Sequence, residues 1–225
     1  MKRISVLLAE DHMIVREGFR KLLESESDME LVGEAQTGRQ VVKMAMALRP
    51  DVVVMDVAMP QMNGLEATRQ IRKAIPDTKV IILSAHSDDA YVERAVDMGA
   101  VGYLLKQTSA HALSEAIREV HKGGTFFSPS IAKRLHGRNR ETLNGKGKLK
   151  KKPIRLSSRE MEVLQQIAEG MPNKQIAAEL GISIKTVEKH RDHVMQKLDI
   201  HDTAGLTRYA IEAGIIESSV QLTIV

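Results

Sequence analysis

Short apolar runs and amphipathic stretches alternate along the first half of the chain. Apolar runs rich in β-branched residues predict strands at 4–9, 31–34, 51–56, 79–84 and 102–105. Between them, apolar positions recur every three or four residues, which predicts helices at about 12–24, 38–48, 64–73, 88–98 and 109–121. This alternation predicts parallel βαβ units, and therefore an α/β, doubly wound, five-stranded parallel sheet with helices on both faces.

Two of the predicted strands have continuously apolar centres. Residues 52–55 and 80–83 contain only Val, Ile, Leu and Met, which is typical of strands buried on both faces of a parallel sheet. Ligands of such sheets bind beyond the carboxyl ends of the strands. We therefore expect the functional side chains of this half to lie at that edge.

The second half of the chain has a different pattern. After about residue 130 the periodicity gives way to Gly, Asn and basic residues as far as Lys152, which predicts a linker. Four helices are then predicted: 158–169 after a capping box of Ser157 and Glu160, 173–180 capped by Asn173, 184–198 capped by Ser183, and 203–213. The second and third helices are separated by the turn at Gly181, which predicts a helix-turn-helix unit.

These patterns divide the chain into four parts. We expect a sheet domain at 1–124, a basic linker at 125–152, a helical domain at 153–217 and a tail at 218–225. The net charge of +4 agrees with this division, because residues 126–152 carry +8 whereas the segments before and after them each carry −2. Two nearly neutral domains are therefore joined by a basic segment.

Composition narrows the class of protein. The chain has no cysteine, which excludes a disulfide scaffold, a thiolate zinc site and a cysteine nucleophile. No apolar run approaches the roughly 20 residues that span a bilayer, and the run that follows Lys2 and Arg3 stops at Ala9, too soon for an export signal. We expect a cytoplasmic protein without a membrane partner.

Polar side chains stand at the carboxyl ends of four of the five predicted strands. They are Glu10, Asp11, Asp56, Ser84 and Lys106, and in a parallel sheet these strand ends meet at one edge. Three unpaired carboxylates would repel one another, which favours a hard divalent cation such as Mg²⁺. Beside such a cation a carboxylate can attack a phosphoryl group and form an acyl phosphate. Taken singly, each of these residues has the simpler interpretation of a cap or a solvated charge.

The predicted helix 184–198 has two unlike faces. At 100° per residue, Val187, Val194 and Leu198 fall on one face and are expected to pack inward. The opposite face holds Lys185, Glu188, Lys189, Asp192 and Gln196. Such donors and acceptors suit base edges in the major groove of DNA. The alternative is a solvated helix face, and the two lysines and two acids leave this face locally neutral.

Three segments of the first half resemble a known family. LAEDH (8–12), MDVAMPQMNG (55–64) and GYLLK (102–106) are similar to motifs of the receiver domain of two-component response regulators. The resemblance covers about residues 2–122. It implies that Asp56 is the phosphoacceptor and that Glu10, Asp11, Asp56 and the carbonyl of Ala58 bind Mg²⁺. It also implies that Lys106 and Ser84 contact the phosphoryl group and that the ring of Tyr103 turns inward as Ser84 moves.

Two segments of the second half resemble a DNA-binding domain. LSSREMEVL (156–164) and NKQIAAELGISIKTVEKH (173–190) are similar to the LuxR class, and with the receiver the chain matches the NarL/FixJ subfamily. The resemblance implies a transcription regulator that accepts phosphoryl from a histidine kinase and binds double-stranded DNA as a homodimer paired through 203–213. The expected DNA contacts are Ser183, Lys185, Thr186, Lys189, His190, Arg191, Gln196 and Lys197.

Three further interpretations concern phosphorylation and the linker. The chain could bind DNA independently of phosphorylation, with a receiver that no longer regulates. An aspartyl-phosphate phosphatase is disfavoured because such enzymes use a second carboxylate two residues after the nucleophile, where Ala58 stands; we therefore expect no enzyme activity. We hypothesise that the linker lysines, Lys146, Lys148 and Lys150 to Lys152, contact DNA phosphates; the alternative is a plain solvated linker.

Overall fold

The computed structural model of the protein describes residues 3–85, 89–107, 110–127 and 156–216. The chain divides into two compact units, Met1–Lys152 and Pro153–Val225, and each is considered by itself. The linker lysines and the predicted tail lie outside the described residues. Within the part that the structure describes, no helix has the length and apolar character needed to cross a membrane.

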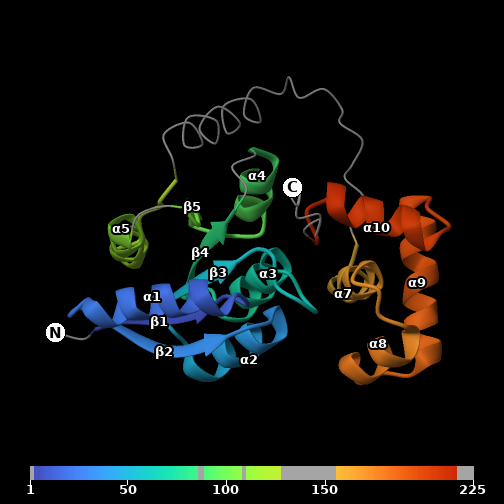
Figure 1. The fold of residues 1–225 in the computed structure, drawn as a ribbon, viewed down its shortest axis with the longest axis horizontal. Helices are drawn as coiled ribbons and strands as arrows, with labels where there is room; N and C mark the ends of the chain where they lie inside the picture. The colour runs from blue at the N-terminus through green and yellow to red at the C-terminus, as the bar shows by residue number, and fades with distance from the viewer. Residues whose placement is uncertain (1–2, 86–88, 108–109, 128–155, 217–225) are drawn as a thin grey trace, which may run out of the picture. The chain divides into compact units, whose positions relative to one another are not determined.

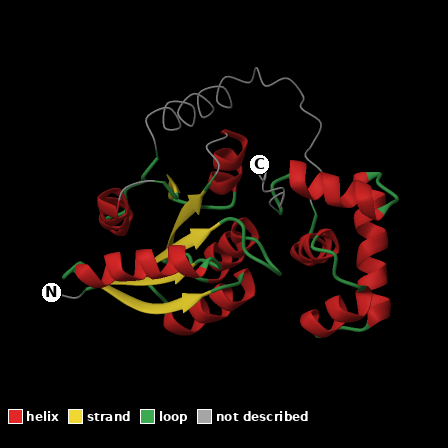
Figure 2. Cartoon of the chain, viewed as in Figure 1, coloured by secondary structure: helices red, strands yellow, loops and turns green. Residues whose placement is uncertain are grey.

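The first unit is a five-stranded parallel sheet in the order β2-β1-β3-β4-β5, flanked by helices (Figures 1 and 2). The strands are β1 (Ile4–Ala9), β2 (Met29–Ala35), β3 (Val52–Asp56), β4 (Lys79–Ser84) and β5 (Gly102–Leu105). The helices are α1 (Met13–Ser25), α2 (Gly38–Leu48), α3 (Gly64–Ala74), α4 (Asp89–Asp97) and α5 (Ala110–His121). The predicted doubly wound sheet is confirmed.

Alternation along β3 distributes its side chains to both faces of the sheet. Val53 and Met55 pack into a core that also contains residues of α2, α3 and α4. Val52 and Val54 pack into the other core, against residues of α1 and α5. All four side chains are fully buried. Covering both faces in this way leaves the strand ends as the edge that is open to ligands.

Two boundaries in the sheet differ from the prediction. β2 is longer than the predicted 31–34, because it pairs with β1 from Met29 to Ala35 even though its polar residues break the apolar run. β3 begins at Val52 and not at Asp51. The carboxylate of Asp51 instead accepts hydrogen bonds from the backbone nitrogen and the hydroxyl of Ser5, at 2.9 and 2.6 Å. The predicted first residues of α4 and α5 lie outside the described residues.

The loop after β3 passes unusually close to the strand that it leaves. The nitrogen of Gly64 donates to the carbonyl of Val57 at 2.8 Å, and a β-carbon at Gly64 would lie 1.9 Å from the carbonyl oxygen of Asp56. Only glycine fits this approach. Asn63 then caps α3 by accepting from the nitrogen of Glu66 at 2.9 Å. The loop that carries residues 57–63 is therefore tied to the end of β3.

The second unit contains four helices within residues 156–216: α7 (Ser158–Ala168), α8 (Asn173–Leu180), α9 (Ile184–Leu198) and α10 (Thr203–Glu212). The predicted capping box of Ser157 and Glu160 is present, and Ser183 caps α9 by accepting from the nitrogen of Thr186 at 3.1 Å. Asn173 was wrongly predicted as a cap. The N-cap is Pro172, which makes no side-chain cap bond, and Asn173 is the first helical residue.

Candidate functional site

Residues from three strand ends meet at the carboxyl edge of the sheet. The ammonium of Lys106, after β5, lies 2.9 Å from Oδ2 of Asp56 and 3.0 Å from each carboxylate oxygen of Glu10. Asp56 is 1% exposed and Glu10 is fully buried. The oxygen Oδ1 of Asp56 also accepts from the backbone nitrogen of Ala58 at 3.3 Å. The sheet thus joins residues that are 96 positions apart in the chain.

Burial dominates the electrostatics of Asp56. Burial, followed by the neighbouring charge of Glu10, raises the pKa of Asp56 to about 7, although Lys106 acts in the opposite direction. Burial also opposes the charge on Lys106, but the carboxylates of Asp56 and Glu10 nevertheless raise its pKa. One partly buried cation therefore faces two buried carboxylates, and the acidic groups of the pocket outnumber its cation.

Three buried oxygens in this pocket each have one polar side chain beside them and no further hydrogen-bond partner among the described residues. Glu10 Oε2 and Asp56 Oδ2 lie 3.0 and 2.9 Å from the ammonium of Lys106, and Asp11 Oδ1 lies 2.9 Å from Nδ1 of His12. Glu10, Asp11, His12 and Asp56 each offer one ligand atom, and these four atoms lie within 4.8 Å of one another. Oxygen ligands with excess negative charge are the donor set that a hard divalent cation prefers, so the residues fit Mg²⁺.

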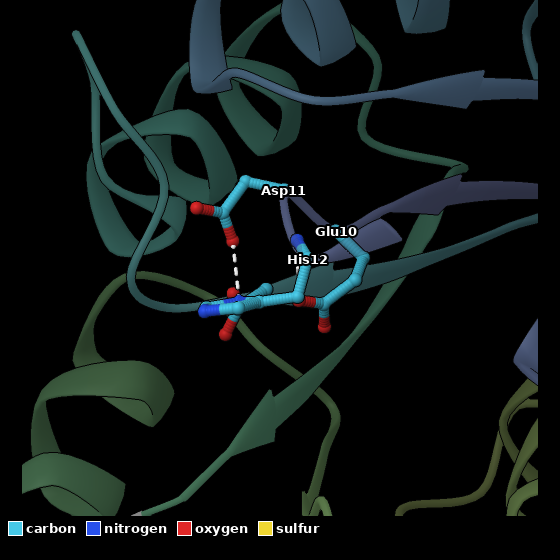
Figure 3. A group of neighbouring side chains, drawn as sticks. Glu10, Asp11 and His12 are labelled. Carbon is cyan, nitrogen blue, oxygen red and sulfur yellow. Dashed lines mark hydrogen bonds and ion pairs between the residues drawn. The ribbon is translucent and has the colours of Figure 1, made fainter. Parts of the chain in front are cut away.

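Two further side chains order the acidic segment. Nδ1 of His12 lies 2.9 Å from Oδ1 of Asp11 and 3.1 Å from Oε1 of Glu10, and Figure 3 shows the Asp11 carboxylate and the His12 ring turned toward each other. Asp11 is the main cause of the raised pKa of His12. Arg16 donates to the backbone carbonyls of Glu10 and Asp11 at 2.9 and 3.2 Å. Sequence reasoning assigned no role to either residue, although His12 directly follows the acidic pair and Arg16 stands five positions after Asp11.

The predicted switch residues lie on neighbouring strands. Ser84 ends β4 and is 1% exposed, and its carbonyl accepts from the nitrogen of Lys106 at 2.8 Å. Tyr103 is 4% exposed and packs into the core on the α2, α3 and α4 side of the sheet. The ring of Tyr103 is therefore already inward in this structure, which is the position that the resemblance reserves for the switched receiver.

Helix α9 has the two faces expected of it. Val187 and Val194 are fully buried and Leu198 is 8% exposed. Figure 1 shows α9 along one side of the helical unit, with α7 and α8 beside it. The residues of the predicted outward face, which are Lys185, Glu188, Lys189, Asp192 and Gln196, are all exposed.

Four more of the residues expected to contact DNA have side-chain partners inside the unit. The hydroxyls of Ser183 and Thr186 lie 2.8 Å apart, and Arg191 donates to the hydroxyl of Thr203. The ammonium of Lys197 contacts both carboxylate oxygens of Glu160, at 2.8 and 2.6 Å. These side chains would have to exchange those partners in order to reach DNA.

His190 lies at the edge between the two faces. It is half-buried, and its burial, followed by the nearby charge of Arg159, lowers its pKa. A neutral imidazole contributes no charge to phosphate binding, so His190 differs in this respect from the lysines of the same helix.

Family models match both units of the chain. The model of the response regulator receiver domain matches residues 6–118, and that of the bacterial regulatory proteins of the luxR family matches residues 155–210. The response regulator protein VraR of Staphylococcus aureus (strain Mu3 / ATCC 700698) is 36% identical over 214 residues, which cover 95% of this chain and 99% of VraR.

Solved structures give the same assignment. A LuxR-family two-component response regulator from Aurantimonas sp. SI85-9A1 is 33% identical, with a TM-score of 0.57, and covers 62% of this chain and 100% of its own. The Salmonella typhimurium RcsB response regulator is 29% identical, with a TM-score of 0.55, and covers 93% of this chain and 98% of its own. RcsB has also been solved in complex with DNA. The chain belongs to the two-component response regulators of the NarL/FixJ type, DNA-binding transcription regulators that join a receiver domain to a LuxR-type helix-turn-helix domain.

Proposed function

We propose that Asp56 accepts a phosphoryl group from a histidine kinase and that this modification controls DNA binding by the helix-turn-helix domain. The observation that carries the proposal is the pocket itself: a buried carboxylate with a cation 2.9 Å from one of its oxygens, beside a second buried carboxylate. An oxygen of Asp56 attacks the phosphorus of phosphohistidine, the phosphorus–nitrogen bond breaks, and the imidazole leaves. Lys106 is within reach of the phosphoryl oxygens, and the hydroxyl of Ser84 donates to one of them.

Mg²⁺ fits the same pocket. Glu10, Asp11, Asp56 and the carbonyl of Ala58 would hold it, and the close grouping of the three carboxylates supports this set. A bound Mg²⁺ neutralises charge on the phosphoryl oxygens. Arg16 holds the backbone of Glu10 and Asp11, so that their carboxylates keep their positions when the cation binds or leaves.

On the DNA side we propose that α9 enters the major groove and that the chain binds as a homodimer on two half-sites. Helix α10 is the expected dimer contact, and Ile211 on it is 36% exposed. Lys185, Lys189 and Gln196 reach the bases or phosphates from the exposed face of α9. Ser183, Thr186, His190, Arg191 and Lys197 complete the proposed contact set from its flanks.

The inward ring of Tyr103 favours a second candidate, a receiver that holds the switched arrangement without phosphorylation. Asp56→Ala separates the two. The full chain is incubated with Mg²⁺ and a small acyl phosphate donor, phosphorylation is followed by intact mass, and binding to operator DNA is followed by anisotropy. We expect the donor to tighten DNA binding by the wild type and to leave Asp56→Ala unchanged. Equal binding with and without donor, despite complete phosphorylation, would establish the second candidate.

A further inference from the structure

The exposed face of α9 carries acids as well as bases. Lys185, Glu188, Lys189 and Asp192 are all exposed, and none of their side chains has a hydrogen bond or an ion pair with another residue that the structure describes. Each lysine stands three positions before an acid, a spacing at which helix side chains can pair. The four charges nevertheless remain separate, and all four are available to a ligand.

Other acids of the same unit are paired. Glu160 is held by Lys197 at 2.6 Å, and Glu162 by Arg159 at 2.9 Å. Glu188 and Asp192, by contrast, have no such partner among the described residues, and both stand on the face that the proposed function assigns to DNA. Both carboxylates would approach phosphates there, and this repulsion lowers affinity for DNA in general. A donor on a base edge is needed to offset it.

The major groove offers two kinds of donor to a carboxylate. Adenine presents its N6 amino group beside the acceptor N7, so a side chain that can both donate and accept, such as Gln or Asn, suits it best. Cytosine presents its N4 amino group without a neighbouring acceptor, and a carboxylate suits it. Guanine, on the other strand of the same pair, presents the two acceptors N7 and O6, which suit lysine.

Resting on the proposed DNA-binding function, we propose that Glu188 and Asp192 are specificity-determining residues that read cytosine. Lys185 and Lys189 contact the guanines of the same or adjacent pairs. Lys189 and Asp192 each stand four residues after Lys185 and Glu188, which places the second pair about 6 Å further along the helix axis. This distance is close to two base-pair steps of DNA, at about 3.4 Å each. Each half-site then contains G·C pairs at two positions about two steps apart.

In vitro selection from a randomised duplex library tests this reading. The full chain, treated with the phosphoryl donor, is compared with Glu188→Gln, Asp192→Asn and Asp199→Asn. The control Asp199 is the exposed C-cap of α9 and lies at the opposite end of the helix; it loses the same charge away from the proposed reading face. All three side chains are exposed, so unfolding midpoints should match the wild type.

We expect the wild type to select G·C pairs and each acid variant to lose its preference at one position. Glu188→Gln should shift that position toward adenine, with about a tenfold change in the cytosine-to-adenine ratio. Binding to unselected DNA should tighten several-fold in both variants, because a negative charge is removed. Asp199→Asn should select the wild-type motif.

Three results would overturn the inference. If both acid variants select the wild-type motif, the carboxylates do not read bases. If the wild-type motif lacks G·C pairs at the two positions, the partner is not cytosine. If the wild type selects no motif at all, the proposed DNA-binding function fails together with the inference, whereas in the first two cases only the inference fails.

Discussion

Two regions of this molecule are built from the same residue types and behave differently. The pocket at the sheet edge joins two buried carboxylates, Glu10 and Asp56, to the single ammonium of Lys106. The outward face of α9 sets Glu188 and Asp192 beside two lysines in solvent. In the pocket the charges contact one another, and burial raises the pKa of Asp56 to about 7. On α9 the charges have no partner among the described residues.

The difference shows what burial does to charged groups. A buried carboxylate must find a cation or a proton within the chain, since water cannot solvate it. The arrangement of charges and protons in the pocket is therefore set by its own residues, and a bound cation or a phosphoryl group can alter it. An exposed charge keeps its water, costs the fold little, and leaves its interaction energy for a partner. Pocket variants should therefore change stability, and α9 variants should change binding.

The largest effect is expected from the pocket lysine. Lys106→Met leaves two buried carboxylates without a cation, which should lower the free energy of unfolding by about 3 kcal/mol at pH 8. The loss should be smaller at pH 5, where the pair takes up a proton. Urea unfolding at both pH values measures it, with Lys43→Met, an exposed residue of α2, as control. An equal loss at both pH values would contradict the charge argument.

Asp56→Asn should raise the free energy of unfolding, whereas Lys106→Met should lower it. The folded-state pKa of Asp56 is about 7, and its unfolded value is about 3.9. Between these values the folded wild type holds an extra proton, so its stability decreases as pH rises through this window. Asn carries no such penalty, and the variant should gain stability that is about 2 kcal/mol larger at pH 8 than at pH 5. If, in metal-free buffer, the difference in free energy of unfolding between Asp56→Asn and the wild type is the same at both pH values, the charged form of Asp56 is not destabilised by burial.

The capping box of α7 should contribute less. The hydroxyl of Ser157 accepts from the nitrogen of Glu160 at 3.3 Å, and Ser157→Ala should destabilise the helical unit by about 1 kcal/mol. Hydrogen exchange of peptides from 156–168 should accelerate about fivefold, while peptides of the sheet should not change. Ser27→Ala, at an exposed serine of the first unit, serves as control. Acceleration in both units would show that they do not unfold independently.

The smallest effect on stability is expected on α9. Lys189→Met should change the free energy of unfolding by less than about 0.5 kcal/mol, because the side chain is exposed and has no ion pair with a described residue. Operator affinity should nevertheless fall about tenfold, and the salt slope of binding should decrease if the contact is to phosphate. Both are measured by anisotropy titrations at several salt concentrations. A large stability change with unaltered affinity would reverse the contrast between the two regions.

Much of the fold could be predicted because the apolar patterns are strong. The apolar cores of β3 (52–55) and β4 (80–83) identify a sheet covered on both faces, and the capping box identifies the start of α7. Local chemistry misled where tertiary structure decides. Asn is a common N-cap residue, but the N-cap of α8 is Pro172 and Asn173 is the first helical residue. The edge strand β2 is held by its pairing with β1, although its sequence mixes polar and apolar residues.

The pocket residues could be found because parallel strands end at one edge. The hydrogen bonds and ion pairs that hold side chains in place could not be predicted from the sequence. Arg16 reaches two carbonyls five and six positions earlier only because the turn before α1 faces its guanidinium. Lys197 meets Glu160 across 37 positions, because α7 packs on α9. Both contacts depend on side-chain direction, which periodicity does not specify.

The close approach at Gly64 has a consequence for how this protein tolerates mutation. The residue has no side chain to bind or transfer anything, yet any β-carbon there would strike the carbonyl of Asp56. In a saturation screen scored by expression of a regulated reporter, Gly64 should rank with the proposed phosphoacceptor itself. A loss-of-function map of this receiver would then identify positions where the backbone leaves no room for a side chain, as well as positions whose side chains take part in the chemistry.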